Sequence, residues 1–263
     1  MPYFNIVAET SENTVVTEYE PVKKRSDSYQ SEAALEQEFI RLLCEQGYEY
    51  LPIHTEKDLI ANLRRKLEEL NNYQFSDTEW DDFFKNAVAN PNEHIVEKTR
   101  KIQEDNVQVL TRDDGSSKNI TLIDKKNIHN NRLQVINQYK VNAATGSREG
   151  SLGCVIGTEN GAKHDNRYDV TVLVNGLPLV HIELKRRGVA IREAFNQINR
   201  YQRDSFWAGC GLYEYIQIFV ISNGTNTKYY SNSTRRNAEK EHEKRGASKT
   251  KTSNSFEFTC FWA

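Results

Sequence analysis

The sequence predicts an α/β domain organised around one β-hairpin. Two apolar runs, Val170–Val174 and Leu179–Lys185, flank Asn175-Gly176, and an Asn-Gly pair between apolar runs is a strong hairpin signal. From Val189 onward the apolar residues follow a helical period, so a helix should come directly after the hairpin. An amphipathic stripe over residues 31–47 predicts an earlier helix. We therefore expect a central mixed sheet that carries the hairpin and is flanked by these two helices.

Length and charge fit one such domain acting on a polyanion. A chain of 263 residues can form one large α/β domain with insertions, which is a simpler arrangement than two small domains. The net charge is −2, but residues 1–100 carry 11 Lys and Arg against 20 acidic residues, while the remainder carries 24 against 17. The hairpin lies in the basic part. This suits a polyanionic substrate, although an ordinary solvated surface would give the same excess.

The cysteines and the hydropathy predict a soluble cytoplasmic protein with no membrane partner. Cys44, Cys154, Cys210 and Cys260 stand apart from one another, which fits reduced thiols rather than zinc ligands. No apolar run approaches the ~20 residues that span a bilayer, and no signal peptide is recognisable.

The other elements are expected in the following order. Residues 1–30 form an N-terminal arm, and residues 31–231 form the main domain. Ser31 is a suitable N-cap and Gly47 a suitable stop for the first helix. Three charge-rich helices at 56–70, 78–88 and 91–103 make a helical insertion over about 56–104, which Trp80, Phe83 and Phe84 anchor by packing. Further strands are expected at 107–111, 119–123, 132–141, 212–222 and 228–231.

Two stretches have no regular pattern. Residues 142–166 hold five glycines and are expected to form a loop. This loop lacks the Gly-Lys-Ser/Thr ending of a nucleotide-binding P-loop, and no ATP site is visible elsewhere. Residues 232–263 begin with a basic segment that is poor in apolar residues, which predicts mobility over 235–251.

The hairpin carries acids and a base in a pattern typical of metal-dependent chemistry. Alternation places His181, Glu183 and Lys185 on one face of the second strand, opposite the apolar residues. Asp169 enters the partner strand nearby. Carboxylate oxygens are ligands that Mg²⁺ prefers, and bound Mg²⁺ can activate a water against a phosphodiester. Lys185 would orient that water or offset negative charge. The pattern therefore indicates a metal-dependent nuclease, whereas a solvated hairpin face is the competing interpretation.

A second stretch of the chain has the same form. Asp113 or Asp114 precedes Asp124-Lys125-Lys126, with an apolar run before the last three. However, residues 113–117 read Asp-Asp-Gly-Ser-Ser, which is turn chemistry, so these acids are better explained as part of a loop tip.

The helix after the hairpin distinguishes the hairpin from the second stretch as a candidate site. Gln197 and Tyr201 are four residues apart and share a helix face. Asp169, Glu183-x-Lys185 and Gln197-x-x-x-Tyr201 together resemble the PD-(D/E)-x-K nucleases of the RecB-like branch. The string from Asn166 to Tyr201 is similar to the R subunit of type I restriction-modification enzymes, particularly the type IC group. The resemblance is specific over about 166–230 and is traceable back to Ser31.

The resemblance implies both a mechanism and partners. It implies a restriction-endonuclease-like core in which Asp169 and Glu183 bind Mg²⁺ and Lys185 positions the attacking water, while Gln197 and Tyr201 support the site or the DNA backbone. The substrate would be double-stranded DNA. ATP would be used only by a motor domain of the same polypeptide, toward which residues 232–263 would lead, so the chain would be a fragment. Methylation and specificity subunits would complete the complex.

Several assignments stay open. In the resembled family a glutamate of the first helix can face the metal, but exposure is expected for each of Glu32, Glu36 and Glu38. A catalytically silent DNA-binding or docking module is an alternative, as is another nuclease of the superfamily, such as a resolvase. Four arginines could contact phosphates or dock a neighbouring domain: Arg186, Arg187, Arg192 and Arg200.

The metal site makes a demand on the hairpin register. A plain two-residue Asn175-Gly176 loop would set Asp169 opposite Ile182 and leave Glu183 on the other face. For both carboxylates to reach one cation, paired residue numbers should sum to 352. This requires a three-residue loop that includes Leu177, or a β-bulge.

Overall fold

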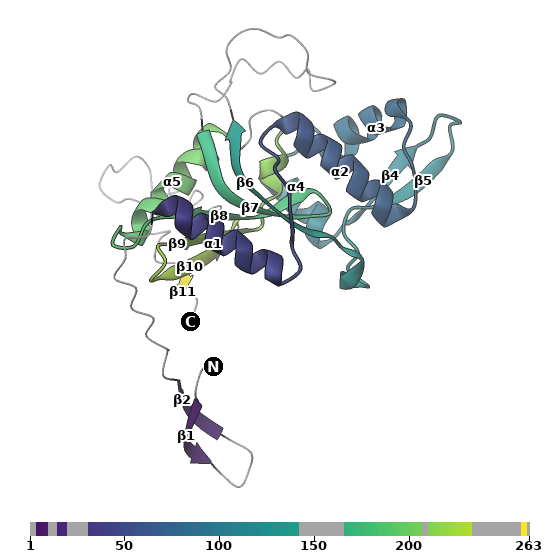
Figure 1. The fold of residues 1–263 in the computed structure, drawn as a ribbon. Helices are drawn as coiled ribbons and strands as arrows, with labels where there is room; N and C mark the ends of the chain where they lie inside the picture. Colours follow the sequence, from purple (N-terminus) through teal and green to yellow (C-terminus); the bar gives the residue numbers. More distant parts are fainter. Residues whose placement is uncertain are drawn as a thin grey trace, which may run out of the picture. The chain divides into compact units, whose positions relative to one another are not determined.

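The computed structural model describes residues 4–9, 15–19, 31–141, 166–206, 210–232 and 259–261. The chain divides into two units, residues 1–30 and residues 31–263. In its described part, the first unit is a two-stranded antiparallel sheet of β1 (Phe4–Glu9) and β2 (Val15–Tyr19). All further elements belong to the second unit (Figure 1).

A seven-stranded sheet forms the centre of the second unit. In spatial order its strands are β11 (Cys260–Phe261), β10 (Thr227–Ser231), β9 (Ile218–Ser222), β8 (Leu177–Leu184), β7 (Asn166–Val174), β6 (Leu133–Val141) and β3 (Glu49–Tyr50). The neighbours β8 and β9 are parallel, as are β3 and β6, and all other neighbours are antiparallel. The expected α/β class with a central mixed sheet is therefore confirmed.

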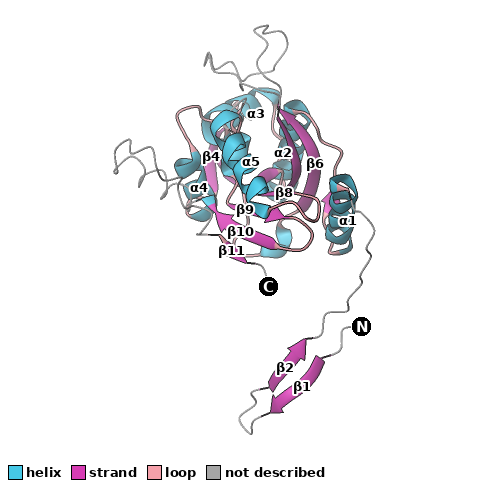
Figure 2. Cartoon of the chain, turned by 90° about the vertical axis from the view of Figure 1, so that its left-hand side faces the viewer, coloured by secondary structure: helices cyan, strands magenta, loops and turns pink. Residues whose placement is uncertain are grey.

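Two helices cover opposite faces of this sheet, as predicted. Helix α1 (Glu32–Glu45) begins at Ser31, whose hydroxyl accepts a hydrogen bond from the Ala34 N–H. Its apolar side packs on one face of β7 and β8, in a cluster that includes Val170 and Ile182. Helix α5 (Ile191–Asp204) lies along β8 and β9, and its apolar residues join the larger core on the other face (Figure 2). The hairpin is consequently covered on both sides.

A helical and hairpin region lies between β3 and β6 in the chain. It contains α2 (Glu56–Asn71), α3 (Asp77–Phe83), a π-helical turn (Phe84–Val88), α4 (Ile95–Gln103), the hairpin of β4 (Val107–Thr111) and β5 (Ser117–Thr121), and a 3₁₀-helix (Ile128–Asn130). Trp80, Phe83 and Phe84 are buried in the core, so they act by packing as expected. Helix α4 begins later than predicted, because the Glu97 carboxylate accepts the His94 N–H in a capping box.

The predicted strand at residues 212–222 was wrong in its first half. Residues Leu212–Tyr215 form a 3₁₀-helix, and β9 begins only at Ile218. Gly211 has φ +65°, a left-handed conformation that turns the chain into this helix. The Tyr215 hydroxyl donates to the Val88 carbonyl at 2.8 Å.

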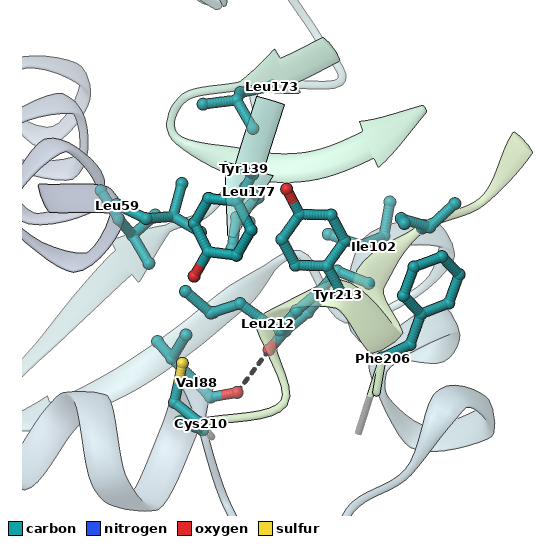
Figure 3. Close-up of a cluster of buried hydrophobic side chains, with 14 of the residues drawn as sticks. Leu59, Val88, Ile102, Tyr139, Leu173, Leu177, Phe206, Cys210, Leu212 and Tyr213 are labelled. Carbon is teal, nitrogen blue, oxygen red and sulfur yellow. Dashed lines mark hydrogen bonds between the residues drawn. The ribbon is translucent and has the colours of Figure 1, made fainter. Parts of the chain in front are cut away.

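The physical reason is burial on all sides. Leu212 and Tyr213 lie deep in the core near Leu59, Val88 and Leu177 (Figure 3). A run that is buried all round has no hydrophobic period, so its sequence does not separate a helical turn from a strand.

The turn of the central hairpin is held tightly by α2. Asn175 and Gly176 have φ values of +51° and +85°, which suits the Asn-Gly type I′ turn. A Cβ atom on Gly176 would lie 2.6 Å from the Leu63 Cα, so only glycine allows this approach. The buried Asn175 side chain accepts the Arg132 N–H and donates to the Leu122 carbonyl. These contacts fix the turn and, through it, the strands that lead to the polar residues.

Two expectations fall outside the described residues: the basic segment at 235–251, and the loop at 142–166 except for Asn166, which begins β7. Within the described part of the chain, no helix combines the length and the apolar character needed to cross a membrane.

Candidate active site

The hairpin has the register that a metal site shared by Asp169 and Glu183 requires. Near the polar residues, paired numbers sum to 352: Val170 pairs with Ile182, Thr171 with His181 and Val172 with Val180. Near the turn they sum to 351, with Leu173 opposite Pro178 and Val174 opposite Leu177. Leu179 is therefore the extra residue of a β-bulge, and the expected correction of the two-residue turn is confirmed. Continuing the register brings Asp169 opposite Glu183.

Asp169, Glu183 and Lys185 meet where β7 begins and β8 ends. The Asp169 Oδ2 accepts the Leu184 N–H at 2.9 Å, which ties this carboxylate to the neighbouring strand. The Lys185 ammonium donates to Glu183 Oε1 at 3.0 Å. Glu183 is fully buried, so the polar face of β8 lies under α5 rather than in solvent. The structure thus brings the three predicted residues together.

Both carboxyl groups resist ionisation. Burial raises the pKa of Asp169 to about 7, and the neighbouring Glu183 charge acts in the same direction. Burial also raises the pKa of Glu183 to about 7, although the Lys185 ammonium opposes this rise. The two groups titrate as a coupled pair. One nearby ammonium does not offset the two neighbouring carboxylates, so a further positive charge at this point would favour their ionised forms.

The environment of Glu183 fits a divalent cation. Glu183 Oε2 is buried and has no hydrogen-bond partner among the described residues. The described part of the chain contains no cluster of three His, Cys, Asp or Glu side chains able to hold a metal. A cation here would therefore have two carboxylates and would keep several waters, as Mg²⁺ commonly does.

Gln197 and Tyr201 join α5 to β7. The Gln197 amide donates to the Tyr201 hydroxyl, which in turn donates to the Arg167 carbonyl at 2.9 Å. That carbonyl lies two residues before Asp169 in β7. Burial, together with the Glu183 charge, raises the pKa of the Tyr201 phenol. These two residues therefore reach the site through the backbone of β7.

One glutamate of α1 also belongs to this region, so the expectation that all three are exposed was wrong for Glu36. Only 7% of Glu36 is exposed, and its carboxylate accepts hydrogen bonds from the Asn137 and Gln138 amides. Burial raises its pKa, and the charge of Asp169 adds to this effect. Its position beside the apolar stripe residues Leu35 and Phe39 was the available signal. Glu32 and Glu38 are exposed, as expected.

The sheet is distorted beside Asp169. Gln138 has φ +52°, a conformation that non-glycine residues rarely adopt. In the β6–β7 register it stands between the pairs Asn137–Val170 and Tyr139–Tyr168, and hence opposite Asp169. Its bond to Glu36 helps to hold this conformation, and backbone strain of this kind often occurs at functional sites.

His181 lies behind Glu183. It is fully buried, and its Nε2 is 3.5 Å from Glu183 Oε2. Burial lowers the pKa of the imidazole to about 4, so the ring is neutral near pH 7. The sequence placed His181 on the polar face but gave no sign of its complete burial.

The acidic side chains of the second stretch accept hydrogen bonds from residues close in sequence. Asp114 accepts hydrogen bonds from the Ser116 N–H and hydroxyl, and Asp124 accepts the N–H groups of Lys126 and Asn127. These bonds lower the pKa of both carboxyl groups. The stretch forms loop caps, as the turn chemistry predicted. The four arginines around the main site are all exposed: Arg186, Arg187, Arg192 and Arg200.

The mixed sheet, its two covering helices and the cluster of Asp169, Glu183 and Lys185 are those of a restriction-endonuclease-like domain. A family model described as "Type I restriction enzyme R protein N terminus (HSDR_N)" matches residues 29–238. The chain belongs to this family.

Named relatives agree with this assignment. The chain is 45% identical over 258 residues to "Type I restriction enzyme EcoprrI endonuclease subunit" of Escherichia coli, covering 98% of this chain and 72% of that protein. It is 37% identical over 209 residues to the SsaAORF53P endonuclease subunit of Staphylococcus saprophyticus, covering 78% of this chain and 20% of that protein. A further relative is the HindI endonuclease subunit of Haemophilus influenzae, 27% identical over 216 residues. The chain thus spans about a fifth of the Staphylococcus protein.

Proposed function

We propose that this chain is the Mg²⁺-dependent DNA endonuclease domain of a type I restriction enzyme R subunit. The observation that carries the proposal is the burial of Asp169 against Glu183, with the pKa of each raised and Lys185 as the neighbouring cation. Two neighbouring carboxylates with one ammonium beside them carry excess negative charge when both are ionised, and a bound cation would balance that charge. The family membership and the names of the relatives support the same activity.

The side chains would divide the work as follows. Asp169 and Glu183 would hold Mg²⁺ through carboxylate oxygens. When bound, the metal would polarise the scissile phosphodiester and lower the pKa of water. Lys185, held at Glu183 Oε1, would position the attacking water and offset negative charge on the phosphate. Tyr201 and Gln197 would keep the start of β7, and with it Asp169, in place.

The substrate and partners follow from the family as proposals. The relatives are named endonuclease subunits of type I restriction enzymes. We infer that double-stranded DNA is the substrate, and that methylation and specificity subunits select it. A motor domain of the same polypeptide would use ATP to bring DNA to the site. We infer that exposed arginines near α5 contact the phosphate backbone.

Cleavage by the complete complex tests the proposal. The complex should be assembled with wild-type R subunit, with Lys185→Ala and with Lys126→Ala. Lys126 is an exposed lysine of the second stretch and serves as the matched control. Wild type and Lys126→Ala should cleave only with Mg²⁺, whereas Lys185→Ala should lose ~100- to 1000-fold in rate while its ATP use is unchanged. Full cleavage by Lys185→Ala would reject the proposed site. The cleavage would then come from another part of the complex, and this domain would be a silent DNA-binding module.

A further inference from the structure

His181 is the polar group beside the site that the proposed mechanism leaves unused. It is fully buried, and neither ring nitrogen has a hydrogen-bond partner among the described residues. Aromatic rings meet it edge-on, with centroid distances of 5.5 Å to Tyr168, 6.1 Å to Tyr201 and 5.4 Å to Phe206. An unsatisfied imidazole in such surroundings destabilises the fold. An apolar ring would fill the same space without this penalty, so the imidazole itself needs an explanation.

The two oxygens of the Glu183 carboxylate have different neighbours. Oε1 accepts the Lys185 ammonium at 3.0 Å. Oε2 is buried, has no hydrogen-bond partner among the described residues, and lies 3.5 Å from the His181 Nε2. Two buried polar atoms without a hydrogen-bond partner among the described residues therefore lie 3.5 Å apart. Hydrogen bonds in active sites are often long without substrate and shorten in the working complex.

We propose that His181 is a positioning residue for Glu183, whose Oε2 accepts a hydrogen bond from the His181 Nε2–H. Lys185 on one oxygen and His181 on the other would together fix the rotation of the carboxylate about its last side-chain bond. A neutral ring has a single N–H, which this contact assigns to Nε2. The inference rests on the proposed function, because it concerns how a metal-binding carboxylate is oriented. Partners of metal ligands act in this way in other proteins.

Two substitutions separate positioning from simple packing. His181→Phe fills the aromatic surroundings but removes the N–H. His181→Gln keeps an amide N–H₂ that can reach the position of Nε2, but fills the space less well. A packing role predicts that the Phe variant is at least as active and stable as wild type, and that the Gln variant is worse in both. A positioning role predicts that the order of activity is the reverse of the order of stability.

The experiment uses the complete R subunit in its assembled complex. Three quantities should be measured for each variant: the cleavage rate, the Mg²⁺ concentration at half-maximal rate, and the melting temperature. Tyr213→Leu serves as the control, because it loosens the same aromatic cluster at Tyr168 and Phe206, one ring away from His181. It should lower the melting temperature and leave the Mg²⁺ requirement unchanged.

We expect His181→Phe to melt at or above the wild-type temperature and to lose ~10- to 100-fold in rate or Mg²⁺ affinity. His181→Gln should stay within ~10-fold of wild type in both, despite equal or lower stability. Wild-type rate and Mg²⁺ requirement in His181→Phe would overturn this inference alone. Equal losses in both His181 variants, each following the melting temperature, would also overturn it. Wild-type cleavage that needs no Mg²⁺ would instead overturn the proposed function, and this inference with it.

Discussion

Two stretches of this chain carry an aspartate followed by an acid and a lysine. The surroundings of the carboxyl groups shift their pKa values in opposite directions in the two stretches. At the β7–β8 hairpin, Glu183 is fully buried and Asp169 is half-buried beside it, and the pKa values of both are raised. In the loops at either end of β5, Asp114 and Asp124 accept N–H and hydroxyl groups from residues close in sequence, and their pKa values are lowered. The residue pattern is similar, but the electrostatic outcome is reversed.

The difference shows what turns a common pattern into a candidate metal site. A carboxylate that is already bonded to local donors gains little from a cation. Two neighbouring carboxylates that are largely desolvated and have only one ammonium nearby gain much more from a cation. The decisive features are the bulge at Leu179, which aligns Asp169 with Glu183, and the cover of α5 over β8. Neither feature is present at the second stretch, where the acids lie in two loops and accept hydrogen bonds from residues close in sequence.

The largest expected effect is on cleavage by variants of the buried pair. Asp169→Asn and Glu183→Gln in the assembled complex should abolish Mg²⁺-dependent cleavage, because each removes a negatively charged oxygen ligand while preserving size. Asp124→Asn, the matched change in the second stretch, should cleave at the wild-type rate. Rates are compared on plasmid DNA with ATP consumption as the control. If Asp124→Asn were as inactive as Asp169→Asn, the contrast between the two stretches would be meaningless.

A second prediction concerns stability and pH. Since the folded-state pKa values of Asp169 and Glu183 are raised to about 7, the stabilisation is complete below about pH 4 and is lost as the pH rises through about 7. One pKa unit corresponds to about 1.4 kcal/mol, or about 3–6 °C in a domain of this size. Without metal, the melting temperature should fall by several degrees between pH 5 and pH 8, and Mg²⁺ should restore it at pH 8. Asp169→Asn should flatten this dependence, whereas an equally steep fall in that variant would show that other groups cause it.

A smaller effect is expected from the residues that support β7. Tyr201→Phe removes the hydroxyl that donates to the Arg167 carbonyl, and Gln197→Ala removes its partner. Each should slow cleavage by ~10- to 100-fold, as is usual for groups beyond direct metal contact. Single-turnover cleavage at saturating Mg²⁺ measures this loss. Complete inactivity in Tyr201→Phe would mean that the phenol contacts the substrate or the metal directly.

The smallest effect is expected from the loop caps. Asp124→Ala leaves the Lys126 and Asn127 N–H groups without an acceptor, so it should lower stability by about 1 kcal/mol. Cleavage at temperatures well below melting should not change. Denaturant unfolding gives the stability, and a loss of cleavage without a loss of stability would contradict the assignment of Asp124 as a structural cap.

The sequence predicted the hairpin and its two flanking helices, but not which polar side chains these helices bury. The Asn175-Gly176 turn, the Ser31 cap and the helical period after Val189 are local signals, and the structure follows them. The need for a bulge could also be stated in advance, because strand alternation is strictly twofold.

The sequence could not predict which side chains would be buried by elements distant in the chain. Glu36 and His181 are buried because other elements close over them, and no local pattern reports such closure. The 3₁₀-helix at Leu212–Tyr215 was missed for a related reason, since a run buried on all sides carries no period. The left-handed conformation of Gln138 depends on its bond to Glu36, a residue 102 positions away.

Direct titration of Mg²⁺ into the R subunit is the measurement that most directly tests the claim that Asp169 and Glu183 hold a cation together. Calorimetry at pH 8 should show a site in wild type that persists in Asp124→Asn and is lost in Asp169→Asn. Binding unchanged in Asp169→Asn, or lost in Asp124→Asn, would contradict the account.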